Sequence, residues 1–139
     1  MTPNLPFRVI IDTNIWISFL IGKTFTELKP LIIDRTVEIV WCTQLRDEIQ
    51  QVTQRPKLQK YFPAAKVQEL LEFLDVISLS VEIQSIVTIC RDEKDNFLLA
   101  LAQDSNANYL ITGDADLLVL EKFGTTEILQ YQEFLARIR

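Results

Sequence analysis

Hydrophobic residues along this chain follow two alternating periods, which predict strands separated by helices. Short apolar runs rich in β-branched and aromatic residues indicate strands at 7–11, 37–41, 76–81 and 109–112, with an edge strand at 127–129. Apolar residues at intervals of three and four indicate helices at 15–20, 26–33, 43–54, from about 63 to 74, 92–104, 114–120 and 131–138. This alternation favours an α/β fold with a mostly parallel central sheet, covered by helices on both faces.

The length and composition are those of one globular domain. A chain of 139 residues is large enough to bury a single core, so residues 1–139 are expected to form one domain. The absence of histidine excludes histidine general bases, Ser-His-Asp and Cys-His nucleophilic sites and histidine-ligated zinc. The two cysteines, Cys42 and Cys90, cannot form a zinc tetrad and are expected to be buried and reduced.

The sequence does not lead us to expect a targeting signal. Residues 1–6 are too short and too polar for a signal peptide, and no apolar run reaches the roughly 18 residues of a membrane span. Reduced cysteines fit a cytosolic location. We therefore expect a cytoplasmic protein that makes no use of a membrane.

The charge of the chain is concentrated at a few candidate positions. A net charge of −5, from 19 acidic and 14 basic side chains, argues against a nucleic-acid binder that works by charge alone. It is compatible with an enzyme whose carboxylates hold metal ions. Without six candidate site residues, 13 acidic and 14 basic side chains remain, so the rest of the chain is nearly neutral. The six are Asp12, Glu48, Asp92, Asp95, Asp114 and Asp116.

Two of these acids stand where a functional role competes with a structural one. Asp12 directly follows the first predicted strand, at the strand end where parallel α/β sheets bind ligands. Asp12, Thr13 and Asn14 could instead simply cap the next helix. Glu48 borders the apolar stripe of its predicted helix, whereas Asp47 points away from that stripe. The alternative for Glu48 is an edge position whose carboxylate reaches water.

The later acids leave the same choice open. Asp95 lies on an apolar face of its predicted helix, and the alternative is that Asp92 and Asp95 complement the positive end of the helix dipole. Asp92 fits that structural role better, because it can be the N-cap itself. Asp114 and Asp116 follow the strand predicted at 109–112, and there too an aspartate can cap the next helix.

The conjunction of these acids is more informative than any one of them. In a parallel α/β fold, the ends of separate strands bring three or four carboxylates to one edge of the sheet. Clustered carboxylates without matching cations repel one another, and a hard divalent cation relieves that repulsion. Mg²⁺ and Mn²⁺ prefer oxygen ligands and do not need histidine. The sequence therefore predicts a Mg²⁺ or Mn²⁺ site.

At these residues the chain resembles the PIN-domain family. The ordered set of four segments, spread over about residues 8 to 120, carries the resemblance, and the subgroup it most resembles comprises toxin components of toxin–antitoxin pairs. The segments are 9–14 (VIIDTN), 45–49 (LRDEI), 90–96 (CRDEKDN) and 111–118 (ITGDADLL). The family often has proline where Glu93 stands, a departure at a helix start that affects no candidate ligand.

The resemblance implies a metal-dependent ribonuclease with a three-layer α/β/α sandwich, acting on RNA phosphodiester bonds and often forming a homodimer. It implies that one or two ions are held by Asp12, Glu48, Asp95 and Asp114, with Asp116 as the reserve for the fourth ligand. Outer groups would orient these ligands and bound waters. These groups are Thr13, Asn14, Asp92 and Thr112. It also implies an antitoxin protein as partner, although a processing nuclease without such a partner has the same site.

A basic and aromatic segment offers a surface for RNA. Arg55, Lys57 and Lys60 can hold phosphates, and Tyr61 can stack on an unpaired base. The alternative is a solvated loop after a helix.

Two further functions compete with the ribonuclease. One is a Mg²⁺-dependent phosphotransferase or phosphatase with Asp12 as nucleophile, but Thr13 and Asn14 follow Asp12 where a second aspartate would be expected. That reading also lacks an obvious lysine after a late strand. The other is a catalytically silent binding module, which predicts broken acidic positions, and all four stand intact.

Overall fold

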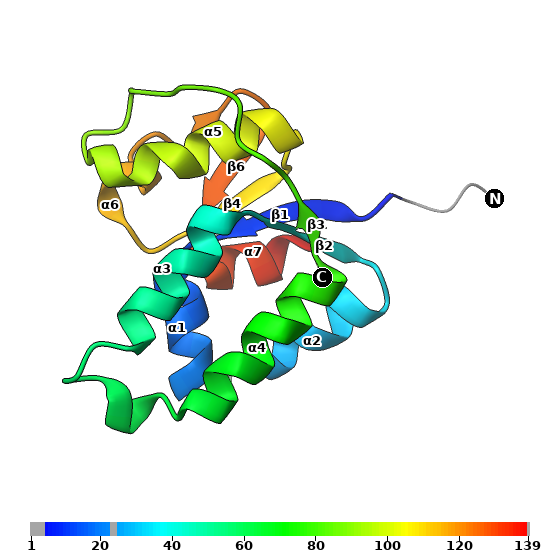
Figure 1. Cartoon of the computed structure of the whole chain (residues 1–139). Helices are drawn as coiled ribbons and strands as arrows, with labels where there is room; N and C mark the ends of the chain where they lie inside the picture. Colours follow the sequence, from blue (N-terminus) through cyan, green and yellow to red (C-terminus); the bar gives the residue numbers. More distant parts are fainter. Residues whose placement is uncertain (1–4, 23–24, 139) are drawn as a thin grey trace.

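The computed structural model describes residues 5–22 and 25–138, which form a single sheet with helices packed against it (Figure 1). The strands are β1 (Phe7–Ile11), β2 (Val37–Trp41), β3 (Leu79–Ser80), β4 (Tyr109–Ile111), β5 (Lys122–Phe123) and β6 (Thr126–Leu129). The α helices are α1 (Thr13–Ile21), α2 (Phe25–Ile33), α3 (Thr43–Thr53), α4 (Ala64–Ile77), α5 (Asn96–Ser105), α6 (Ala115–Leu118) and α7 (Tyr131–Ile138). Two short 3-10 helices are η1 (Gln59–Tyr61) and η2 (Glu93–Asp95).

The order of the strands creates a switch point at the centre of the sheet. The order is β3-β2-β1-β4-β6-β5, and neighbouring strands are parallel except for the antiparallel pair β5 and β6. The chain runs outward from β1 through β2 to β3, then crosses back to place β4 on the other side of β1. Open α/β sheets bind ligands outside the carboxyl ends of their strands at such a point. The fold therefore directs attention to the residues that follow β1 and β4.

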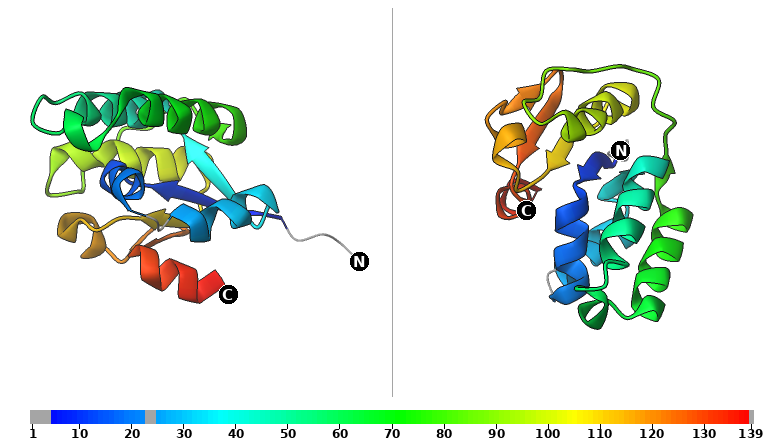
Figure 2. Two further views of the ribbon diagram at one scale, coloured as in Figure 1. Left: turned by 90° about the horizontal axis from the view of Figure 1, so that it is seen from below. Right: turned by 60° about the vertical axis from the view of Figure 1, so that its left-hand side comes forward.

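Helices cover the sheet on both faces. Helix α5 lies on one face, and α1, α2, α4 and α7 lie on the other (Figures 1 and 2). This confirms the three-layer α/β fold with a mostly parallel sheet that the sequence predicted. The last three residues of β1 and all of β4 are buried, as expected for central strands packed on both sides.

The two helical layers bury their side chains in different ways. Residues 98–102 of α5 are all buried, so this helix is apolar around most of its circumference. On the other face, aromatic rings join two helices to the sheet, because Trp16 of α1 packs edge-on against Phe25 of α2 and Trp41 of β2, as well as against Phe19 of its own helix. Phe134 of α7 packs against the ring of Tyr109 in β4 at 5.5 Å. These contacts hold α1, with Asp12 at its start, in place on the sheet.

Several predicted boundaries differ from the structure. The strand expected at 76–81 is reduced to β3, because helix α4 continues through Ile77 and Ser78 N–H still donates to the Leu74 carbonyl. The helix expected at 92–104 begins with the 3-10 turn η2 and becomes α-helical only at Asn96. At the start of α3, Cys42 occupies the N-cap position and Thr43 is the first helical residue.

The strand expected at the sheet edge proved to be an inner strand. Strand β6 lies between β4 and β5, and the short strand β5 forms the edge. A tight turn at Gly124, whose φ is +60°, brings β5 back against β6. A two-residue strand is too short to produce a recognisable alternation of apolar residues, which is why the sequence pattern missed it.

Two smaller observations concern the cysteines and the lengths of the helices. Cys42 and Cys90 are both buried and free. Across the described residues, no helix combines the length and apolar character needed to cross a bilayer.

Candidate metal centre

Asp12 stands at the carboxyl end of the central strand β1, next to β4. Its backbone N–H donates to the Ile111 carbonyl at 2.9 Å, which joins the ends of the two strands. Its Oδ1 accepts the Asn14 N–H at 3.4 Å, so Asp12 also caps α1. The capping role and a place at the switch point are therefore both features of this residue. Asp12 is buried, whereas Asn14 is exposed.

Thr112 joins the two central loops through one hydroxyl group. Its Oγ1 donates to Asp12 Oδ2 at 2.7 Å and accepts the Asp114 N–H at 3.0 Å. The Thr112 side chain is fully buried. Thr112 therefore fixes the orientation of the Asp12 carboxylate and the start of the loop that carries Asp114.

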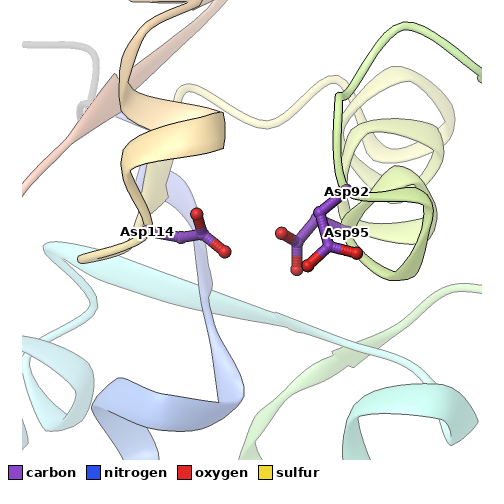
Figure 3. Close-up of side chains that lie close together, drawn as sticks. All are labelled: Asp92, Asp95 and Asp114. Carbon is purple, nitrogen blue, oxygen red and sulfur yellow. The ribbon is translucent and has the colours of Figure 1, made fainter.

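Three aspartates from two loops bring their carboxylates together beside this point. Asp92, Asp95 and Asp114 each offer an oxygen, and these oxygens lie within 4.8 Å of one another. Figure 3 shows Asp114 facing Asp92 and Asp95 across the gap between the loop after β4 and the start of α5. All three side chains are half-buried. We refer to Asp92, Asp95 and Asp114 as the acidic cluster.

Repulsion and burial change the pKa values of two of these acids. Burial is the main cause of a raised pKa for Asp12, and the nearby charge of Asp114 raises it further. For Asp95, burial together with the hydrogen bond and charge of Asp114 raises the pKa from the ordinary 3.8 to about 7. Asp12 and Asp92 add to the same effect. Asp12 is therefore an electrostatic neighbour of the acidic cluster.

The donor set of the site suits a hard divalent cation. The carboxylate oxygens of the acidic cluster converge, and Asp12 is their electrostatic neighbour. Within the described residues no ion pair with a lysine or arginine involves any of these acids. The Oδ2 atom of Asp95 is buried and has no hydrogen-bond partner. A bound Mg²⁺ or Mn²⁺ would supply the missing positive charge and a partner for that oxygen.

Glu48 is linked to the residue that follows Asp12. The Thr13 hydroxyl donates to Glu48 Oε2 at 2.7 Å, and Thr13 is itself buried. Glu48 is half-buried and Asp47 is exposed, which agrees with the helical positions that the sequence predicted for them. Glu48 is not part of the acidic cluster, so its place in the site comes through Thr13, the residue next to Asp12.

Asp92 was expected to be an outer group and Asp116 a reserve metal ligand, and the structure places them differently. The sequence assigned Asp92 to an outer role, but its carboxylate belongs to the acidic cluster while its Oδ1 also accepts the Lys94 N–H at 3.1 Å. Asp92 and Asp95 are three positions apart, about one helical turn, and this spacing could have indicated that both carboxylates lie on the same side. Among the described residues, Asp116 is not a member of the cluster, and its N–H donates to Asp114 Oδ1 at 2.8 Å.

The predicted RNA-binding residues lie in the connection between α3 and α4. Arg55, Lys57, Lys60 and Tyr61 are all exposed, and the Lys60 ammonium lies over the Tyr61 ring at 5.0 Å from its centre. This connection follows the end of α3 farther from the sheet (Figure 1). The segment is therefore separated from the acidic cluster by the length of that helix.

Carboxylates gathered at the switch point of a mostly parallel α/β sheet, in a chain without histidine, form a donor set made of oxygen atoms, which suits a hard metal ion. The particular family follows from comparison with known proteins. The family model described as the PIN domain matches residues 8–116, and the chain belongs to the PIN-domain family. Membership indicates a nuclease, and PIN nucleases generally use a divalent metal ion.

Two individual proteins illustrate how far this likeness extends. An uncharacterized protein of Methanocaldococcus jannaschii, MJ1680, is 30% identical over 119 residues, which cover 84% of this chain and 76% of that protein. A chain in the crystal structure of VapBC2 from Rickettsia felis, bound to a DNA fragment from the promoter, superposes with a TM-score of 0.55. That alignment covers 88% of this chain and 97% of the other, at 14% identity, and shows that the fold is shared.

Proposed function

We propose that this protein is a Mg²⁺- or Mn²⁺-dependent ribonuclease that hydrolyses internal phosphodiester bonds of RNA. The observation that carries the proposal is the acidic cluster with the charge of Asp12 beside it, which no lysine or arginine of the described residues neutralises through an ion pair. Such an arrangement is costly unless a metal ion occupies it. The proposed ligands are Asp12, Glu48, Asp92, Asp95 and Asp114, with Asp116 in reserve.

The residues of the chain have distinct parts in this proposal. When bound, the ion supplies an activated water and stabilises negative charge on phosphate oxygens. Thr112 holds the Asp12 carboxylate through its hydroxyl, and Thr13 holds that of Glu48. Because both hydroxyls are buried, the two carboxylates are oriented before the ion or the substrate arrives. Asp114 is held by its own capping bond to the Asp116 N–H.

The reaction class is tested by comparing two substrates. A labelled single-stranded RNA and a generic phosphate monoester are each incubated with the protein in Mg²⁺, in Mn²⁺ and in EDTA. We expect cleavage within the RNA that requires the metal, and no release of phosphate from the monoester. Monoester hydrolysis without RNA cleavage would favour the phosphatase alternative, in which Asp12 is the nucleophile.

We further propose that the nuclease is the toxin of a toxin–antitoxin pair and that a small protein restrains it. The fold shared with a chain of the VapBC2 structure supports this proposal, together with the hazard of a free ribonuclease in its own cytosol. A partner segment with an arginine could place a fork of donors among Asp12, Glu48, Asp95 and Asp114. A homodimer and a cytoplasmic location also remain predictions, which light scattering and cell fractionation test.

The antitoxin proposal is tested in the natural host. The chain is expressed alone, beside the Asp12→Asn variant as a matched control. Growth arrest by the wild type but not by the variant, relieved by the product of one neighbouring gene, is the expected result. Normal growth with abundant active enzyme would instead indicate a housekeeping RNA-processing nuclease.

A further inference from the structure

A pocket of about 760 Å³ lies beside the proposed catalytic site at the same edge of the sheet. Its walls come from the end of β2, the first turns of α3, Asp75 of α4 and residues 80–83. Strand β2 is the parallel neighbour of β1, which leads into Asp12, so the pocket and the metal centre both follow the carboxyl ends of adjacent strands. The pocket volume falls within the roughly 300–1,000 Å³ typical of sites for small organic groups.

The pocket and the site also meet along α3. Gln44 lines the pocket, and Glu48 lies one helical turn further on. Cys42 is another wall residue, and its pKa is raised mainly by burial and further by the negative charges of Glu48 and Asp47. The pocket therefore lies one helical turn of α3 from Glu48, on the β2 side of the proposed site.

The charge of the walls selects against a phosphate. Arg46 is the one cation that lines the pocket in the described part of the chain, and its Nε donates to both carboxylate oxygens of Asp75, at 3.1 and 3.2 Å. The Trp41 indole N–H donates to the same carboxylate at 3.1 Å. With Arg46 neutralised, the carboxylates of Asp47 and Glu82 leave the walls negative. Such walls repel an anion and accept hydrogen bonds from a neutral donor.

We propose that this pocket binds an unpaired RNA base next to the phosphate that is cleaved, and that it selects bases carrying an exocyclic amino group. This inference rests on the proposed ribonuclease activity. Adenine, cytosine and guanine present an amino donor to a carboxylate, whereas uracil presents carbonyl oxygens in that place. Thr43, Gln44 and Ser80 add neutral polar groups that suit the edge of a base, and Trp41, Val81 and Ile83 add apolar surface that suits its face.

Two variants change the pocket without touching the metal centre. Ser80→Phe places a ring in the pocket from an exposed position on β3, and Glu82→Gln removes one wall charge. Glu69→Gln is the matched control, because Glu69 is exposed on α4 and makes no part of the pocket. Thermal melting checks that each variant folds. Hydrolysis of bis(p-nitrophenyl) phosphate, which has no base, checks that the metal centre is intact.

Cleavage of a random-sequence single-stranded RNA pool, with sequencing of the cut ends, gives the specificity. We expect the wild type to disfavour uracil at one position beside the cut, and Glu82→Gln to weaken this preference at least threefold. Ser80→Phe should lower kcat/KM for RNA at least tenfold, with hydrolysis of the small diester within twofold of wild type. Wild-type cut sites and rates in both variants would overturn the pocket assignment while leaving the ribonuclease standing.

A binding measurement separates the two proposals. A non-cleavable 2′-O-methyl oligonucleotide of mixed sequence is titrated against wild type and Ser80→Phe, with Trp41 as a fluorescent reporter in the pocket wall. Binding that Ser80→Phe weakens supports the base pocket even if RNA is not cleaved. Equal binding by the two proteins, or no binding by either, overturns it.

Discussion

At the scale of a single residue, Asp95 shows how the acidic cluster destabilises the folded protein when no metal ion is bound. Burial and the neighbouring Asp114 raise its pKa to about 7, above the ordinary 3.8 that it regains on unfolding. The folded state therefore holds its proton more tightly than the unfolded state, and stability falls as the pH rises between these two values. The ionised carboxylate of Asp95 is unfavourable in the folded protein, and binding of a cation reverses that unfavourable free energy. Acids with pKa values shifted in this way are typical of functional sites.

The first prediction concerns this pH dependence. In EDTA, the free energy of unfolding of the wild type should decrease from about pH 4 to pH 7, and Asp95→Asn should flatten that decrease. Urea unfolding at a series of pH values measures it. Asp47→Asn is the control, because Asp47 is exposed. The same slope in Asp95→Asn as in wild type would contradict the cluster as its origin.

A second prediction separates catalysis from stability. Asp12→Asn and Asp95→Asn should abolish metal-dependent hydrolysis, since an amide coordinates a hard cation more weakly than a carboxylate does. Both variants should match or exceed the stability of the wild type in EDTA, because they remove like-charge repulsion. Hydrolysis assays and melting curves on the same samples test the two effects together. A variant that loses activity because it unfolds would not support the assignment.

The third prediction compares neighbours on α3. Glu48→Gln should greatly reduce hydrolysis of bis(p-nitrophenyl) phosphate, because Glu48 is a proposed metal ligand whose carboxylate is held by Thr13, the residue after Asp12. Asp47→Asn should stay within about twofold of wild type on this small substrate, since Asp47 is exposed and faces the neighbouring pocket. Steady-state rates in saturating Mn²⁺ are compared. Equal losses in the two variants would show that the helical face does not matter.

At the scale of elements, the site depends on two adjacent strands that end level with each other. The pairing of β1 with β4 sets Ile11 opposite Ile111, so the next residues of each strand, Asp12 and Thr112, lie side by side. Their hydrogen bond spans 100 positions of sequence. The strand register is thus what brings the first acidic segment to the last one.

The fourth prediction tests this link. Thr112→Val keeps the shape of the side chain but leaves Asp12 and the Asp114 N–H without the shared hydroxyl, which should cost about 1–3 kcal/mol of stability. Hydrolysis should fall by about 10–100-fold, as for other groups that orient a metal ligand. The matched control is Thr126→Val, because the buried Thr126 hydroxyl donates to the Ala107 carbonyl away from the site. Thr126→Val should lose stability and keep its hydrolytic activity. Equal losses of activity in the two variants would contradict the role of Thr112 in positioning Asp12.

At the scale of the whole molecule, a ligand that binds only the folded site stabilises the entire domain. The fifth prediction is that Mn²⁺ or Mg²⁺ raises the Tm relative to EDTA, by about 2.7 kcal/mol of stabilisation at a metal concentration 100 times the Kd. Differential scanning calorimetry measures the shift. Asp95→Asn should show a much smaller one, and an unchanged midpoint in the wild type would argue against the metal site.

The local pattern of apolar and polar residues determined several elements of the fold by itself. The bounds of β1, β2 and α7 agree with the apolar runs that predicted them, because strands buried on both faces and amphipathic helices leave a strong signature in neighbouring residues. The same pattern could place Asp12, Glu48 and Asp114 after strands or on a helix face. It could not find β5, whose two residues carry no period, or the end of α4, where an apolar run suits either a helix or a strand.

What only the tertiary structure decided is which groups meet. The entry of Asp92 into the acidic cluster depends on how η2 is turned toward the loop after β4, and the bonds from Thr112 and Thr13 depend on strand register and helix packing. The base pocket joins the ends of β2 and β3 with Asp75, which are distant in sequence. Periodicity reports which side of an element is buried, but distances between elements arise from packing of the whole chain.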